Sequence, residues 1–114
     1  MYTEIHFTAA ALVAPTLVLP SREVGAVVEF QGIVREREGE QALQGLFYEA
    51  YEPMARRQLE RIFTELAALH PVQAVLFFHR LGWVPVGESS LFVRVFFPVT
   101  GAKDLPFAAA RLIG

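Results

Sequence analysis

Three short stretches of the sequence combine residue types that can do chemistry. The first, residues 27–35, reads VVEFQGIVR, an apolar run that a glycine interrupts and that ends in the cation Arg35. A guanidinium is permanently charged and offers a planar fork of donors to phosphate or carboxylate. At a strand end Arg35 can leave the core and face a cleft, and Gly32 allows a bulge or a close backbone approach. Local sequence alone favours the plainer alternative, in which Arg35 opens a solvated, charged loop over residues 37–40.

The second stretch, residues 48–55, reads YEAYEPMA. Strand alternation places Tyr48 and Ala50 on one face and Glu49 and Tyr51 on the other. A buried carboxylate beside aromatic rings can serve as an acid or a base. The more common outcome is a strand with one polar face, followed by a carboxylate that favours the start of the next helix.

The third stretch, residues 77–95, reads FFHRLGWVPVGESSLFVRV. His79 and Arg80 follow an apolar strand, where a histidine can be a base, a pH-sensitive switch or a hydrogen-bonded structural residue. Because His6 and His70 lie far away in the sequence and no other ligands accompany them, no metal site is expected. The chain also has no P-loop, G-x-G-x-x-G or G-x-S-x-G motif. These residues alone indicate an α+β domain with a candidate anion pocket.

Apolar alternation and β-branched content predict the strands that would position these residues. They cover residues 2–8, 25–35, 43–51, 72–79 and 89–97. Residues 82–87 are expected to form a turn region, residues 20–23 a short turn, and residues 104–111 a short helix. Strands gathered around one long helix predict an α+β fold.

Pro53 opens the long helix and Pro71 ends it, so the helix is expected over residues 53–69. Its apolar side chains recur at helical spacing: Ala55, Leu59, Ile62, Phe63, Leu66 and Leu69. Most of the stability of such a helix comes from packing this stripe on a sheet.

Composition restricts the class of protein. At 114 residues, 54% of them hydrophobic and 19% charged, the chain is expected to be a single domain over residues 1–114. Ten Phe and one Trp are a generous aromatic supply for this length, which favours a subunit over a free monomer. The formal charge of −2 provides no basic surface for nucleic acid. There is no cysteine, which excludes disulfides, thiolate metal sites and cysteine nucleophiles.

The apolar run over residues 9–19 is too short to span a bilayer and contains Pro15. The first residues lack the positive region of a signal peptide. We therefore expect a soluble, cytoplasmic protein that binds neither membrane nor nucleic acid.

Taken together and in order, these segments resemble the large, catalytic subunit of molybdopterin synthase. The matching residues are Gly25-Ala26-Val27-Val28, Phe30-x-Gly32-x-Val34-Arg35, Leu46-x-Tyr48-Glu49-x-Tyr51-x-x-Met54-Ala55, His79-Arg80-x-Gly82 and Val86-Gly87-Glu88. These blocks occur in the family's order over residues 25–95, with a helix between residues 48–55 and residues 77–95. This order makes the match specific.

The resemblance implies an α/β-hammerhead-like fold, a mostly antiparallel sheet packed on one long helix, in a homodimer within a heterotetramer. It also implies a partner, a small ubiquitin-like sulfur-carrier subunit whose C-terminal thiocarboxylate enters a pocket on the large subunit. Sulfur passes to cyclic pyranopterin monophosphate, which gives molybdopterin for the molybdenum cofactor. The carrier brings the sulfur, so no metal and no cofactor of the large subunit is expected.

For the site, the resemblance implies that Ile33, Val34 and Arg35 line the substrate pocket. Arg35 would face the anionic phosphate, to which a guanidinium can make a charge-assisted, bidentate contact. The pairs Tyr48-Glu49 and His79-Arg80 also match the family pattern, in structural or supporting roles.

The end of the chain departs from the family pattern. The family continues its last strand into a His-Arg pair, whereas Val99 and Thr100 follow Pro98 here. The family's two lysines, expected to transfer protons and stabilise anions, have no counterpart, because the single lysine, Lys103, stands in a different context. No catalytic residue is therefore assigned, and the family's C-terminal segment is expected to be lacking.

Three expectations follow from this departure. The first is a working or recently working large subunit whose C-terminal chemistry is reduced or supplied by another chain. The second is a catalytically inactive homologue that serves as a binding and dimerisation scaffold for the sulfur carrier or an active paralogue. The third is a truncated gene product without an independent role.

Overall fold

The structure, a computed structural model, describes residues 1–98 of the chain. Its elements in chain order are β1 (Tyr2–Thr8), β2 (Ala26–Ile33), β3 (Arg37–Glu38), β4 (Gln41–Ala42), β5 (Gly45–Tyr48), α1 (Glu52–Leu69), β6 (Ala74–Arg80), β7 (Gly82–Pro85) and β8 (Ser89–Phe97). The expected strands over residues 2–8 and 89–97 are confirmed at both ends, and the helix begins one residue before the expected position. The helix expected over residues 104–111 lies outside the described residues.

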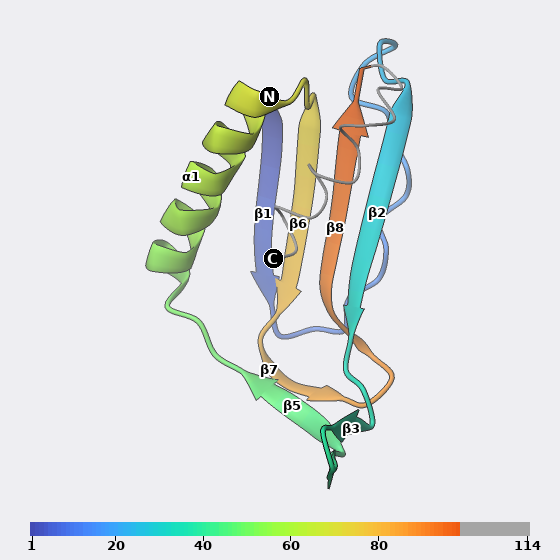
Figure 1. Cartoon of the computed structure of the whole chain (residues 1–114), viewed down its shortest axis with the longest axis vertical. Helices are drawn as coiled ribbons and strands as arrows, with labels where there is room; N and C mark the ends of the chain where they lie inside the picture. Colours follow the sequence, from blue (N-terminus) through green and yellow to red (C-terminus); the bar gives the residue numbers. More distant parts are fainter. Residues whose placement is uncertain (99–114) are drawn as a thin grey trace.

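A four-stranded sheet in the order β1-β6-β8-β2 dominates the fold (Figure 1). Strands β1 and β6 run parallel, whereas β6–β8 and β8–β2 are antiparallel. The central strand β8 is buried at every position from Phe92 to Phe97, and its nearly continuous apolar sequence reflects this. The expected α+β fold with a mostly antiparallel sheet and one long helix is confirmed.

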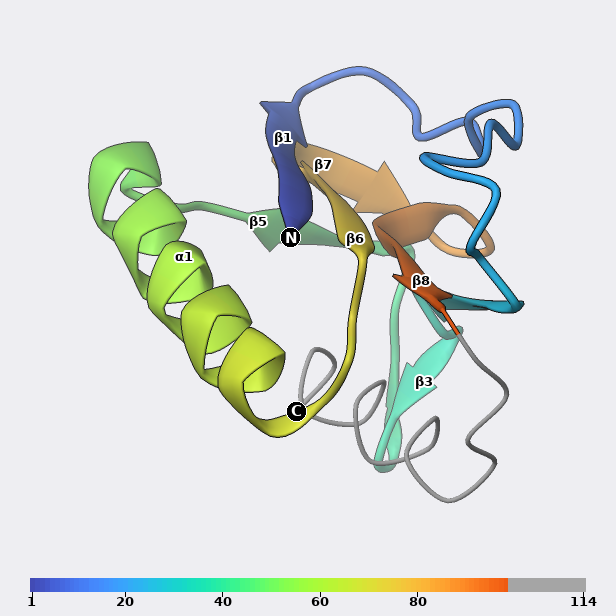
Figure 2. The same cartoon turned by 90° about the horizontal axis from the view of Figure 1, so that it is seen from above.

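The two faces of this sheet are covered by different parts of the chain. Figure 2 shows α1 on one side and the segment that joins β1 to β2, residues 9–25, on the other. The core lies on the helix side and consists of Ile5, Phe63, Leu66, Val72, Val75, Phe77, Val93, Val95 and Phe97. Six apolar helix positions were expected to face the core. The prediction is wrong for Leu69, which lies in the last turn and is 63% exposed.

The helix ends follow from local chemistry. Tyr51 is the extended residue before the helix, and its carbonyl accepts the Ala55 N–H at 3.0 Å. Glu52 adds a carboxylate to the first turn, where the helix dipole favours negative charge. At the other end the His70 N–H donates to the Leu66 carbonyl at 2.9 Å, and a proline follows. No helix within residues 1–98 has the length and apolar character needed to cross a membrane.

The expected turn region over residues 82–87 is wrong in its first half. Residues Gly82–Pro85 form β7, which pairs with β5 in an antiparallel sheet, and only the end of the region is a turn. Both Gly82 and Gly87 have φ of 86°, a conformation that glycine adopts without strain. The strand expected over residues 43–51 is shorter and covers only Gly45–Tyr48. The charged turn expected near Gly39 is the turn of a hairpin between two short strands, β3 and β4.

Gly45 permits the close packing of β5 against β7. A Cβ added at this position would lie 2.5 Å from a Trp83 ring carbon and 2.5 Å from the Val84 carbonyl oxygen. Gly45→Ala should therefore destabilise the protein by about 1–3 kcal/mol, because the backbone oxygen cannot move aside without disturbing the pairing. Gly32→Ala is the matched comparison, since its Cβ would come no closer than 3.3 Å to Leu91. Urea unfolding of both variants measures the difference, and equal losses would contradict this packing argument.

Candidate anion-binding site

A bulge opens the pairing of β2 with β8 at Gly32. Gly32 pairs with Leu91 and the next residue, Ile33, pairs with Ser89, so Ser90 is the extra residue on β8. The Ser90 hydroxyl donates to the Gly32 carbonyl at 3.4 Å. The bulge that Gly32 was expected to allow is present, and it marks the point at which β2 leaves the sheet.

The backbone beyond the bulge is held in place by a turn. The Val34 N–H donates to the Glu88 carbonyl at 3.1 Å, and the Val34 carbonyl accepts the Gly87 N–H at 2.9 Å. The Val34 side chain is buried, whereas that of Ile33 is about half exposed. Of the three residues expected to line a substrate pocket, Val34 therefore anchors the chain, and Arg35 follows directly from this anchor.

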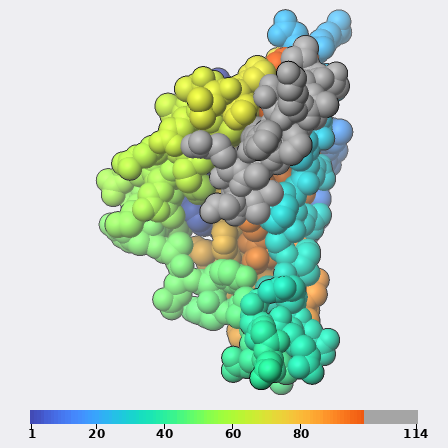
Figure 3. Space-filling model, viewed as in Figure 1, coloured from blue at the N-terminus to red at the C-terminus, as the bar shows by residue number. Residues whose placement is uncertain are grey.

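Arg35 itself points into solvent. Its side chain is 72% exposed, and Nη2 donates to Oε1 and Oε2 of Glu38 at 3.1 and 3.2 Å. The β3–β4 hairpin that carries Glu38 lies within the teal segment that projects at the lower end of the molecule in Figure 3. Arg35 lines neither the hollow between α1 and the sheet nor the one on the opposite face of the sheet. In a single chain this guanidinium thus binds a carboxylate on an open surface.

Arg80, the other arginine expected at a strand end, lies in a different environment. Its side chain is 12% exposed, and Nη1 donates to Glu88 Oε1 at 2.7 Å. Its Nε is buried and has no hydrogen-bond partner within residues 1–98. Arg80 is committed to Glu88, and the pair supports the turn to which Val34 binds.

The structure brings Tyr48, Glu49 and His79 to one hollow of about 270 Å³ between α1 and the sheet. The Tyr48 ring meets the imidazole edge-on, with centroids 5.3 Å apart. Nδ1–H of His79 donates to the Arg80 carbonyl at 2.8 Å, because a carbonyl can only accept. Glu49 is exposed, so the burial that an acid or base role would require is missing. Within the described residues, no three side chains cluster as metal ligands.

Sequence reasoning missed Arg94, which is 3% exposed in the middle of β8. Its Nε donates to Glu29 Oε1 at 2.6 Å, and its two terminal nitrogens donate to the carbonyls of Pro15 at 2.9 Å and Thr16 at 3.4 Å. The guanidinium also lies 5.2 Å from the centre of the Phe92 ring. A charged residue inside the apolar run LFVRVFF, opposite Glu29 on β2, was the signal that could have identified it.

A family model described as MoaE protein matches residues 3–103 of the chain. The chain belongs to this family. The resemblance drawn from the ordered sequence blocks is therefore confirmed, and the bulge, the turn and Arg35 are features of a MoaE-family protein.

Curated relatives of this MoaE-family chain are molybdopterin synthase catalytic subunits. The protein of Oryza sativa subsp. indica is 46% identical over 70 residues, which cover 60% of this chain and 36% of the relative. The protein of Homo sapiens is 38% identical over 96 residues, which cover 80% of this chain and 50% of the relative. The chain thus spans between about a fifth and a half of the length of the curated relatives it matches.

Solved structures share the fold of this MoaE-family chain. The crystal structure of molybdopterin synthase from Staphylococcus aureus matches with a TM-score of 0.69 and 30% identity, over 81% of this chain and 69% of that one. A complex of subunits 1 and 2 of molybdopterin-converting factor from Helicobacter pylori matches with a TM-score of 0.64 and 26% identity, over 81% of this chain and 58% of that one.

Replacing Arg94 tests its contribution to this architecture. Arg94→Leu should cost about 2–4 kcal/mol of unfolding free energy, because Glu29 and two carbonyls lose their donor. Arg94→Lys should lose nearly as much, since an ammonium cannot reproduce the fork that reaches three acceptors. Urea unfolding measures the loss, and limited proteolysis should cut residues 9–24 faster. Arg57→Leu, on the exposed side of α1, is the control and should change stability by less than about 0.5 kcal/mol; a similar loss there would contradict the assignment.

Proposed function

We propose that this chain acts as the large subunit of molybdopterin synthase in molybdenum cofactor biosynthesis. It would convert cyclic pyranopterin monophosphate to molybdopterin with sulfur from a thiocarboxylated carrier subunit. The match to the MoaE protein family over residues 3–103 supports this assignment, as does the similarity to curated molybdopterin synthase catalytic subunits.

One structural observation supports a specific phosphate-binding residue, Arg35. Arg35 extends from a backbone that Gly87 and Glu88 fix, yet its guanidinium is solvated and holds only an exposed carboxylate. Exposed ion pairs of this kind contribute about 0–1 kcal/mol, so an anionic ligand can replace Glu38 at little cost. We assign Arg35 to the phosphate of the pterin, with Ile33 and Val34 beside it in the substrate pocket.

The open position of Arg35 also supports a partner. A phosphate contact becomes strong only when water is excluded around it, and the described part of a single chain supplies no such enclosure at Arg35. The two-subunit complex from Helicobacter pylori supports a small sulfur-carrier subunit as one wall of the pocket. We further propose a homodimer within a heterotetramer, in the cytoplasm, with the sulfur supplied by the carrier and no metal or cofactor bound by this chain.

A catalytically inactive binding scaffold is the second candidate. Residues 1–98 contain no lysine, and the groups that pair with Arg35 and Arg80 there are carboxylates. Within the described residues, anion binding at Arg35 is therefore not accompanied by the lysines that the family is expected to use for proton transfer. Such a protein would bind the sulfur carrier or an active paralogue without transferring sulfur.

The test compares two exposed arginines that lie two positions apart. With thiocarboxylated carrier and cyclic pyranopterin monophosphate, Arg35→Ala should lower the rate of molybdopterin formation by about 30-fold or more, the effect of losing a charged contact to a desolvated anion. Arg37→Ala should leave the rate near that of the unchanged chain, because Arg37 lies on the exposed β3 hairpin. Neither change should shift the unfolding free energy by more than about 1 kcal/mol.

The outcomes separate the two candidates. Absence of product from the unchanged chain, with carrier binding retained in calorimetry, would replace the enzyme by the scaffold. Equal rates for the two alanine variants would remove Arg35 from the substrate site while leaving the family activity in place.

A further inference from the structure

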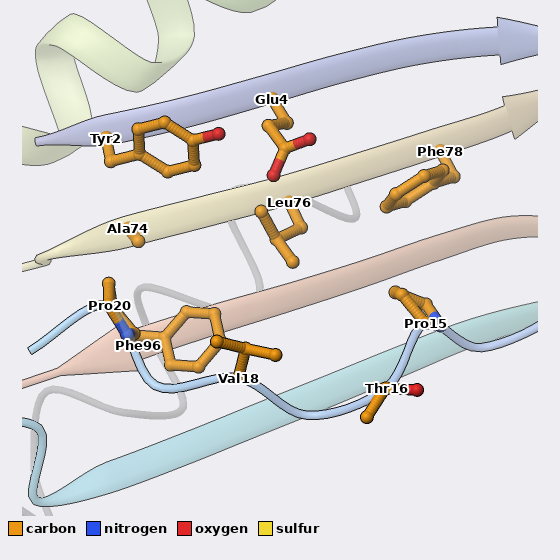
Figure 4. A pocket seen from close by; sticks show the side chains of 10 residues that line it. All are labelled: Tyr2, Glu4, Pro15, Thr16, Val18, Pro20, Ala74, Leu76, Phe78 and Phe96. Carbon is orange, nitrogen blue, oxygen red and sulfur yellow. The ribbon is translucent and has the colours of Figure 1, made fainter.

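A hollow of about 330 Å³ lies on the face of the sheet opposite α1, beneath the segment that joins β1 to β2. Figure 4 shows the residues that line it: Tyr2, Glu4, Pro15, Thr16, Val18, Pro20, Ala74, Leu76, Phe78 and Phe96. The floor comes from β6 and β8, one wall from β1 and the roof from residues 15–20. Its volume is within the range of small-molecule sites, about 300–1,000 Å³.

The roof of this hollow is fastened at two places. On one side the buried Arg94 guanidinium donates to the carbonyls of Pro15 and Thr16. On the other the Ser21 hydroxyl donates to the Gln73 side-chain carbonyl at 3.0 Å. Because these contacts already order the segment, a ligand would not have to pay the entropy of closing it, which favours binding.

The polar groups of the hollow lie together at one wall. Figure 4 shows the Tyr2 hydroxyl extending along β1 toward Glu4, whose carboxylate is directed toward Leu76. A hydrogen bond to Glu4 raises the pKa of the Tyr2 phenol, so its hydroxyl stays neutral at physiological pH. Glu4 Oε1 also lies 3.0 Å from Nε2 of His6, whose ring stacks on Phe78 at 4.7 Å. A carboxylate has about four lone-pair sites, so these contacts leave acceptor capacity free.

The charge balance of the hollow favours a cation. Of the described residues that line it, Glu4 alone carries a charge. The nearby Arg94 is paired with Glu29, and each of its terminal nitrogens donates one hydrogen bond to the roof. A positive group is therefore attracted here, whereas an anion of the same shape meets the Glu4 carboxylate, whose contact with His6 lies outside the lining of the hollow.

We propose that this hollow binds a primary organic ammonium ion with an aromatic or short aliphatic body. The ammonium donates to the Glu4 carboxylate and to the Tyr2 hydroxyl oxygen, as charge-assisted hydrogen bonds require. The body lies on Leu76 and Phe96, and the faces of the surrounding aromatic rings add attraction for the positive charge. This site is separate from Arg35 and takes a ligand of the opposite charge.

The experiment is an NMR titration of the full chain, labelled with ¹⁵N, with two probes of nearly equal shape. Phenethylammonium should give saturable shifts at the amides of Glu4, Val18 and Leu76, and 3-phenylpropionate should give none there. Glu4→Gln should weaken phenethylammonium binding about tenfold, since it removes the charge and keeps the shape. Glu36→Gln, an exposed carboxylate outside the hollow, should leave the affinity unchanged.

Equal shifts with the two probes, no saturable shift around the hollow, or the same affinity in Glu4→Gln as in the unchanged chain would each overturn the proposal. The probe comparison uses the unchanged chain, so it decides the question even if Glu4→Gln fails to fold. No pterin or carrier is present, and the result is therefore independent of the proposed sulfur transfer.

Discussion

The buried guanidinium of Arg94 is the interaction on which one whole face of the sheet depends. Taking such a cation out of water costs several kcal/mol unless hydrogen-bond acceptors surround it. Here the acceptors are the Glu29 carboxylate from β2 and two main-chain carbonyls of the segment that joins β1 to β2. This segment is therefore a structural part of the fold although it has neither helix nor strand, because without it a buried charge would lack its partners.

Apolar burial alone does not explain why the segment stays on the sheet. Its apolar side chains are largely exposed: Val13 is 84% exposed, Val18 73% and Leu17 54%. The helix on the opposite face behaves differently, since Phe63 and Leu66 are buried in the core. One face is thus closed by side-chain packing and the other by hydrogen bonds to the backbone of the segment. A roof held through its carbonyls is not drawn tightly onto the apolar floor, which explains the hollow beneath it.

The sequence predicts an element of this fold well where the local residue pattern determines it, and poorly where pairing with a distant strand determines it. Both ends of β8 were predicted correctly, because a long apolar run is a strong local sign of a buried strand. The helix was predicted to within one residue, because Pro53 and Pro71 mark its two ends. β7 was missed because Gly82, Pro85 and Gly87 are turn-type residues, and only pairing with β5 makes the stretch a strand. The alternation of exposed Trp83 with buried Val84 was a weak local sign of it. A charge inside the apolar run of β8 marks Arg94 as unusual, but the run does not reveal its partners, because two of them lie on a segment almost eighty positions away.

The same distinction decides which arginine can bind an anion. Local sequence alone offers Arg35 and Arg80 on similar terms, since each stands at the end of an apolar strand, and only the family resemblance gives Arg35 the substrate pocket and Arg80 a supporting role. The Arg80 side chain is only 12% exposed and already holds Glu88, so another anion would have to give up its water to reach the guanidinium and would displace Glu88 from it. The Arg35–Glu38 pair is solvated on both sides and loses little when it opens. The backbone hydrogen bond from Val34 to Glu88 joins the two ion pairs. The Arg80–Glu88 pair therefore helps to fix the backbone from which Arg35 extends.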